Sequence, residues 1–250
     1  MPAPISESDF TTTANSIFDN QEKIRGLINK CVDTFNDRST WGNFTIWITG
    51  KLDQVRDALN DLVAKFAAFA KAVAELHSPG NPVSMYTKAD DWREVQSKLS
   101  GQLGELSASR FPATYSWEGR DGWAYAGIVG DQEAAVSGAY PHADALGSHL
   151  ETHAKNVIDG WSDIALTVGT IYLSFVRDAS QFISASPTKW LDIVPVIVTL
   201  IADLIENVAN GVDQLVEYAT TAFAGMKELA GALASVPGSR AQAWPTADFA

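Results

Sequence analysis

The sequence predicts an all-α protein, an elongated bundle of long antiparallel helices arranged as hairpins. Three observations support this prediction. Apolar residues recur at alternating spacings of four and three over several long stretches, which is the period of a helix that buries one face. Short stretches rich in proline, glycine and small polar residues separate these segments. No stretch shows the sustained apolar–polar alternation of a half-buried strand.

The beginning of the chain, residues 1–78, predicts a first helical hairpin. Helices are expected from Ser6 to Asp37 and from Phe44 to His77, with the stretch NDRSTWGN as the turn between them. The second helix carries the clearest heptad seam of the chain, which consists of Ile48, Leu52, Val55, Leu59, Leu62, Phe66, Phe69, Val73 and Leu76. We expect this seam to be buried against the first helix, whose own seam is interrupted by Gln21.

A linker and two further hairpins are expected after it. The stretch HSPGNPVS holds two prolines and a glycine and predicts a linker at 79–87. The second hairpin spans 88–157, and a strongly apolar third hairpin spans 158–236 and turns at SASPTK; a flexible tail occupies 237–250. The expected helices run from Lys88 to Arg110, Asp121 to Val157, Trp161 to Ser184 and Thr188 to Ala234, and all are expected to join one continuous bundle.

Composition limits the partners of the chain. With 46% hydrophobic and 19% charged residues in 250, the chain belongs to the globular class. A net charge of -12 repels phosphate backbones, so nucleic acid is not expected as a partner. The single cysteine, Cys31, cannot form an internal disulfide and lies on an apolar seam, where we expect a small core residue and not a reactive thiol.

The N-terminal stretch MPAPISESDFTTT has neither the basic region nor the apolar region of a cleavable secretory signal. The longest uncharged apolar runs are Ile164 to Val176 and Ile193 to Ala202. Both are shorter than the ~20 residues that a lone helix needs to cross a bilayer.

The stretch YSWEGRDGWAYAG, from Tyr115 to Gly127, lies between the two helical seams of the second hairpin. Its composition predicts a turn, in which Gly119 and Gly122 permit unusual backbone angles and the tryptophans pack the open end. Trp117, Glu118 and Gly119 match the turn tripeptide of the W-x-G family, and the chain resembles this family over roughly Ala89 to Val157. The family consists of helical-hairpin proteins exported by type VII (ESX-type) secretion systems of actinobacteria and their relatives.

The resemblance implies a secreted or cell-surface protein that is cytoplasmic before export and acts through a protein partner or self-assembly. Trp117, Gly119 and Trp123 would then form a recognition turn, with Trp117 partly exposed beside a groove. The family's export signal is a Y-x-x-x-D/E pair on a helix, and Tyr86 and Asp90 have this spacing. In the first hairpin, Trp41 and Gly42 would mark a diverged copy of the turn, although they adjoin each other instead of bracketing a residue.

Catalysis has no support in the sequence, so we expect no enzyme, no cofactor and no small-molecule substrate. His149 and His153 lie one turn apart, a spacing that can bind a transition metal. His142 lies too far along the helix to complete a site with both, and the H-E-x-x-H pattern is absent. We therefore predict no metal site here and interpret these histidines as part of a solvated helix face.

The third hairpin leaves an alternative open, because its apolar faces would suit a membrane if they left the bundle. The residues concerned are Ile171, Phe175, Trp190, Ile197 and Ile201. Carboxylates such as Asp203 oppose entry of a lone helix by roughly 2.5–3.5 kcal/mol each at the bilayer centre, but several chains together could turn them toward a watery lumen. The pattern resembles that of α-helical pore-forming toxins; the other interpretation is a packed core.

Overall fold

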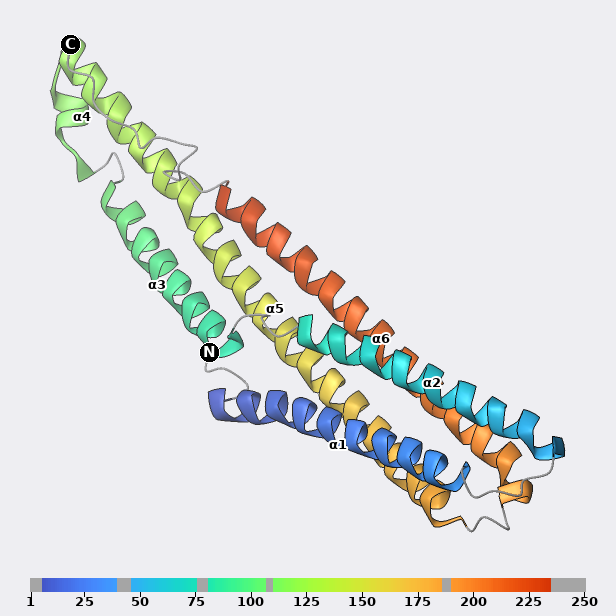
Figure 1. Ribbon diagram of the computed structural model, residues 1–250. Helices are drawn as coiled ribbons and strands as arrows, with labels where there is room; N and C mark the ends of the chain where they lie inside the picture. Colours follow the sequence, from blue (N-terminus) through green and yellow to red (C-terminus); the bar gives the residue numbers. More distant parts are fainter. Residues whose placement is uncertain (1–5, 40–45, 76–80, 107–109, 186–189, 235–250) are drawn as a thin grey trace. The chain divides into compact units, whose positions relative to one another are not determined.

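A computed structural model of the chain describes residues 6–39, 46–75, 81–106, 110–185 and 190–234 (Figure 1). Over these residues it is all-α, without a strand, and its long helices pack against one another, which confirms the predicted fold class. The helices are α1 (Glu7–Ser39), α2 (Ile46–Glu75), α3 (Pro82–Leu106), α4 (Ala113–Ser116), α5 (Arg120–Ser184) and α6 (Trp190–Ala234). Trp41, Gly42 and the tail 237–250 lie outside the described residues.

Helix α3 begins at Pro82, six residues before the expected start at Lys88, so the predicted linker is wrong over residues 82–87. The Asn81 side chain caps this helix, since its Oδ1 accepts hydrogen bonds from the backbone N–H groups of Val83 at 3.0 Å and Ser84 at 3.2 Å. Proline is well suited to the first helical position, where its missing N–H has no partner to lose. The cap and the proline together explain why the helix starts early.

Helix α5 continues without a break through the segment from Val157 to Trp161, where the sequence predicted one helix to end and another to begin. Its 65 residues also include Pro141, which costs one backbone hydrogen bond. Gly160 permits a close contact, because a Cβ there would overlap the ring of Tyr218 on α6. The apolar spacing is unbroken across this segment, and packing of that stripe outweighs the helix-breaking tendency of a single glycine.

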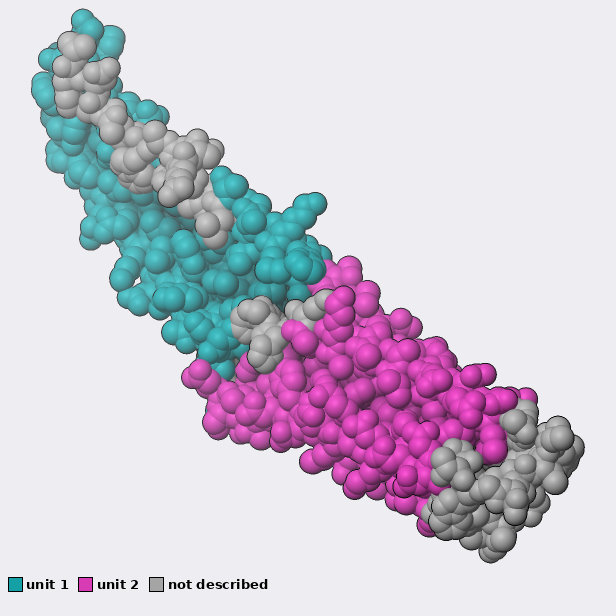
Figure 2. Space-filling view, viewed as in Figure 1, with its two compact units in different colours: residues 1–6, 80–157, 221–250 teal, residues 7–79, 158–220 magenta. Residues whose placement is uncertain are grey.

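The chain divides into two compact units (Figure 2). Unit 1 comprises residues 1–6, 80–157 and 221–250, and unit 2 comprises residues 7–79 and 158–220. Within unit 2 most of the predicted third hairpin, residues 158–220, therefore packs with the first hairpin. Whether the consecutive segments named from the sequence act as domains stays a prediction.

The core of unit 2 is formed by α1, α2 and the parts of α5 and α6 that belong to it. The α2 seam is buried at every described position: Leu52, Val55, Leu59, Leu62, Phe66, Phe69 and Val73. Trp161 of α5 lies between Phe10 and Phe18 of α1, with ring centroids 6.1 and 6.5 Å away. Gly211 of α6 lets that helix approach Phe69, since a Cβ there would lie 3.2 Å from the ring. The prediction that the seam is buried is confirmed.

We predict that Leu59→Asp lowers the free energy of unfolding by roughly 3–5 kcal/mol or prevents folding, because it places an unpaired carboxylate in the core. Val63→Asp, one turn further along α2, is the matched control: Val63 is 44% exposed and its replacement should cost less than about 1 kcal/mol. Urea unfolding followed by circular dichroism measures both. Equal stability of the two variants would show that the seam is not a core.

Candidate functional site

The W-x-G turn joins α4 to α5 within unit 1. Helix α4 ends at Ser116, and its C-cap residue Trp117 has an extended backbone at φ -92° and ψ 111°. Gly119 has φ +99°, in the left-handed region that favours glycine, and its carbonyl accepts the backbone N–H of Trp123 at 3.1 Å. The glycine of the tripeptide thus makes the turn and starts α5, as the sequence predicted.

Gly122 has a different role from the expected one. It lies in the first turn of α5 with an ordinary helical backbone, so unusual angles are not its purpose. A Cβ at this position would overlap the backbone carbonyl of Trp117. The second glycine of the stretch WEGRDG is therefore needed for the close approach of the turn to the helix.

Three aromatic side chains of this turn are exposed. Trp117 is 50% exposed, Tyr115 69% and Trp123 78%. The Trp117 ring contacts only one other ring, that of Tyr125 at a centroid distance of 5.9 Å, among the described aromatic pairs. Partial exposure of Trp117 is thus confirmed, whereas the expectation that Trp123 packs the hairpin is wrong, because its side chain points to solvent. A groove beside Trp117 stays a prediction.

The hairpin behind the turn is formed by α3 and the first part of α5, and α3 is buried only near its start. In α3 the buried residues are Pro82, Tyr86 and Ala89, all in its first two turns. Further along α3, the apolar residues that repeat with helical spacing are half-buried or exposed: Trp92, Val95, Leu99, Leu103 and Leu106. Two helices can cover only one face of each other, so an apolar strip remains accessible along α3.

The predicted export pair lies on α3, and its members differ in accessibility. Tyr86 is 6% exposed, and Asp90, one turn on, is exposed. Asp90 Oδ1 accepts from Arg93 Nη1 at 3.0 Å, and the other nitrogen of that guanidinium, Nη2, donates to Glu151 of α5. Arg93 thus ties the two helices together near Gly147, where a Cβ would lie 3.2 Å from the carbonyl oxygen of Ala89.

The histidine pair of α5 faces α6 within unit 1. His149 Nδ1 lies 3.9 Å from Glu228 Oε2, and His153 is buried at 6% exposure. The expectation of a solvated face is therefore wrong for His153, because α6 returns along this side of α5. Across the described residues no three ligand-type side chains are grouped so that they could hold a metal ion.

The apolar hairpin contributes Ile171 and Phe175 to the core of unit 2, where they are 2% and 1% exposed. The side chains of Trp190, Ile197 and Ile201 are outside those that the structure describes, although their backbones lie in α6. Leu166 and Leu173 lie on the opposite side of α5 and are 71% and 69% exposed. In the part of the chain described here, none of the helices combines the length and the hydropathy needed to span a bilayer.

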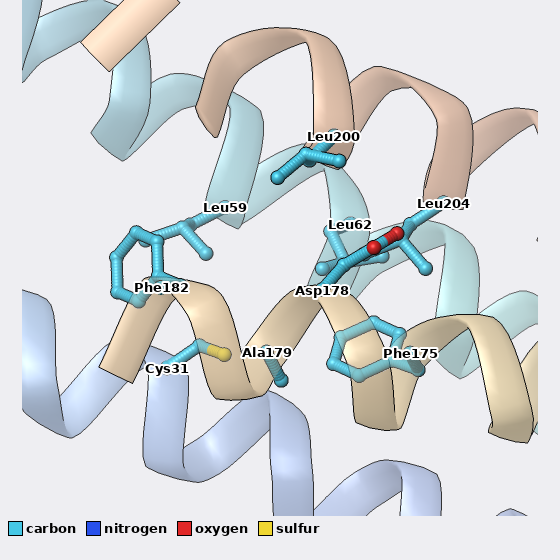
Figure 3. A pocket seen from close by; sticks show the side chains of 9 residues that line it. All are labelled: Cys31, Leu59, Leu62, Phe175, Asp178, Ala179, Phe182, Leu200 and Leu204. Atoms are coloured by element: carbon cyan, nitrogen blue, oxygen red, sulfur yellow. The ribbon is translucent and has the colours of Figure 1, made fainter. Parts of the chain in front are cut away.

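A small cavity of about 20 Å³ lies between all four helical segments of unit 2 (Figure 3). Its lining is apolar except for Cys31 and Asp178. Burial raises the pKa of the Cys31 thiol to about 11, so the thiol is protonated and unreactive at neutral pH. Asp178 is buried and accepts a hydrogen bond from Arg177 Nε at 2.7 Å. The space is comparable to that of a single water molecule, which rules it out as an organic ligand site.

Sequence reasoning missed three of these features: the close approach at Gly122, the Arg93–Glu151 bridge and the burial of His153. Two glycines three residues apart, Gly119 in the tripeptide and Gly122 after it, were a usable signal for the close approach. The other two depend on which helix lies opposite, which the sequence does not show locally. Comparisons of the chain with family models, curated proteins and solved structures gave no match.

We predict opposite effects for two glycine substitutions near the start of α5. Gly122→Ala should destabilise unit 1, since the added methyl group collides with the Trp117 carbonyl. Gly127→Ala is the matched control: nothing lies within 4 Å of the added Cβ, so higher helix propensity should stabilise the protein by about 0.5–1 kcal/mol. Thermal unfolding of both variants tests this. If Gly122→Ala were as stable as Gly127→Ala, the close approach would be irrelevant.

Proposed function

We propose that the chain is a non-enzymatic protein of the W-x-G type, exported by a type VII secretion system, which acts by binding another helical protein or a further copy of itself. The observation that carries the proposal is the exposed aromatic group at the W-x-G turn, Tyr115, Trp117 and Trp123. Large aromatic side chains on a fixed backbone are the residues most often found at the energetic centre of protein interfaces.

The turn has the rigidity that recognition requires. Gly119 in its left-handed conformation and the tight contact at Gly122 fix the path of the backbone on both sides of Glu118. A site held in its binding conformation loses little conformational entropy when a partner docks. The half-buried strip along α3, in the same unit, offers further apolar area to a partner helix.

The Y-x-x-x-D pair would contribute to export through Asp90 and the face of α3 around it. Tyr86 is enclosed by its own unit, so a receptor that reads the tyrosine ring has to meet it after local opening of α3. Asp90 is exposed and accessible at once. We therefore assign Tyr86 a packing role in the folded protein and Asp90 the role of the accessible member of the pair.

We predict that Trp117→Ala lowers stability by only about 1–2 kcal/mol, since half of this side chain is already in water, but abolishes export and partner binding. The experiment expresses both forms in a bacterium with a type VII system and in the same strain with its secretion ATPase inactivated. Wild-type protein should reach the medium only with the active ATPase, and Trp117→Ala should stay folded inside the cells. ATPase-independent export of the wild type, or normal export of the variant, would contradict the proposal.

Trp161→Ala is the matched control for this experiment. Trp161 is 3% exposed, so its truncation should destabilise unit 2 by roughly 3–5 kcal/mol. Any loss of export with this variant would accompany a loss of folded protein, as circular dichroism of the cell-purified material would reveal. The two tryptophans thereby separate recognition from stability.

We infer a second candidate function, membrane insertion of the α5–α6 hairpin of unit 2, because the segment Ile164 to Val176 carries no charge and has large apolar side chains on two sides. Leu166 and Leu173 face solvent while Ile171 and Phe175 face the core. Large apolar side chains exposed beside a buried apolar face offer additional area to an apolar environment. This candidate differs from the first in that the core itself would have to open.

The buried thiol provides a direct test of that opening. If the hairpin enters phosphatidylcholine vesicles, Cys31 loses its cover from Phe175 and Phe182, so its reaction with a maleimide should accelerate at least tenfold while the vesicles release trapped dye. Cys31→Ala controls for labelling elsewhere and should still release dye. An unchanged labelling rate together with retained dye would rule out this second function and leave the first untouched.

A further inference from the structure

The last part of α6, residues 221–234, makes only a thin contact with α5 in unit 1. No described residue of this stretch is buried, and the half-buried ones are spaced by three and four along one side: Ala222, Gly225, Leu229 and Ala232. Three of these side chains are small or absent. The larger apolar residues Phe223 and Met226 point away, at 69% and 46% exposure. Since hydrophobic stabilisation scales with apolar area buried, this contact is weak.

His153 takes part in this contact through Gly225. Its Nδ1 atom is fully buried and has no hydrogen-bond partner in the described part of the chain. The imidazole packs against the backbone of Gly225, where a Cβ would come to 3.2 Å from Nδ1. A neutral imidazole loses one hydrogen bond in this position, but a protonated one would hold a charged N–H donor without an acceptor in an apolar environment.

The charged groups around His153 do not compensate such a charge. On α6 the stretch carries Lys227 and Glu228, and Glu228 lies 3.9 Å from His149. On α5, Glu151 is engaged by Arg93 of α3, which also binds Asp90. None of these carboxylates accepts a hydrogen bond from the buried His153 Nδ1, which has no partner in the described part of the chain.

We propose that residues 221–234 form an acid-released arm, which lies on α5 while His153 is uncharged and detaches when His153 takes up a proton. The inference does not depend on the function of the W-x-G turn.

The direction of the pH dependence follows from burial. Desolvation lowers the pKa of His153 below its ordinary value of 6.5, so the detached state binds the proton more tightly than the docked state. Docking is at full strength above pH 6.5 and weakens as the pH falls through and below that value. The docking constant should fall by up to about tenfold per pH unit until the pKa of the docked state is reached.

Hydrogen exchange with mass spectrometry measures this release. Protection factors of amides 221–234, corrected for intrinsic exchange, should drop about tenfold or more between roughly pH 7.5 and pH 5, while those of α2 stay constant. His153→Leu removes the titrating group and should make the protection of the arm independent of pH. His149→Gln is the matched control one turn away and should keep the drop.

Several results would overturn the proposal. One is protection of the arm that does not change with pH in the wild type. Another is a drop in that protection that persists in His153→Leu. The third is a simultaneous loss of protection in α2, which would indicate global unfolding. If His153→Leu does not fold, the imidazole resonance of wild-type His153 decides the question by nuclear magnetic resonance. A titration midpoint at or above 6.5 would then refute the release.

Discussion

Burial of the apolar stripe along α5 is the interaction on which both units depend. In unit 1 the stripe includes Val136, Ala143 and Val157, and in unit 2 it includes Ile164, Val168, Ile171, Phe175 and Phe182. A helix of 65 residues that contains a proline and several glycines has modest intrinsic stability, so its neighbours must stabilise it laterally. In unit 2, α1, α2 and α6 accompany α5, and the residues of its stripe are enclosed. Where α3 alone accompanies it, aromatic residues stay in water, and this difference places the candidate recognition surface in unit 1.

Glycine has two distinct uses along these helices. Gly119 provides a backbone angle, whereas Gly122, Gly160 and Gly225 provide space, for the Trp117 carbonyl, the Tyr218 ring and the His153 imidazole respectively. The contacts made in that space are close but small in apolar area. Such contacts fix geometry better than they supply stability. The turn uses this property to hold tryptophans in position, and the end of α6 uses it to stay detachable.

The sequence predicted the helical class, the α2 seam and the turn at Gly119, because each depends on a pattern local to one helix or one loop. It did not predict the continuity of α5, although Val157, Trp161 and Ile164 keep the same spacing of four and three as the rest of the stripe. The sequence also predicted the wrong exposure for two residues of α5: Trp123 is exposed instead of packed, and His153 is buried instead of solvated. Their exposure depends on whether a helix distant in sequence covers them. Gln21, which interrupts the α1 seam, is nevertheless buried, and its Oε1 has no partner in the described residues.

The composition of unit 2 from two separated segments, 7–79 and 158–220, affects the order in which the chain can fold. During synthesis, α1 and α2 leave the ribosome long before Trp161 and Tyr172, the residues of α5 that Phe18 and Lys23 of α1 contact. Contacts between such distant segments form slowly, and until they form the seam of α2 is accessible to water and to other chains. The hairpin 80–157 is contiguous and has no such delay. A nascent chain that has released residues 1–157 therefore contains the whole hairpin 80–157 while the core of unit 2 still lacks residues 158–220, and a chaperone would encounter the protein in this state first.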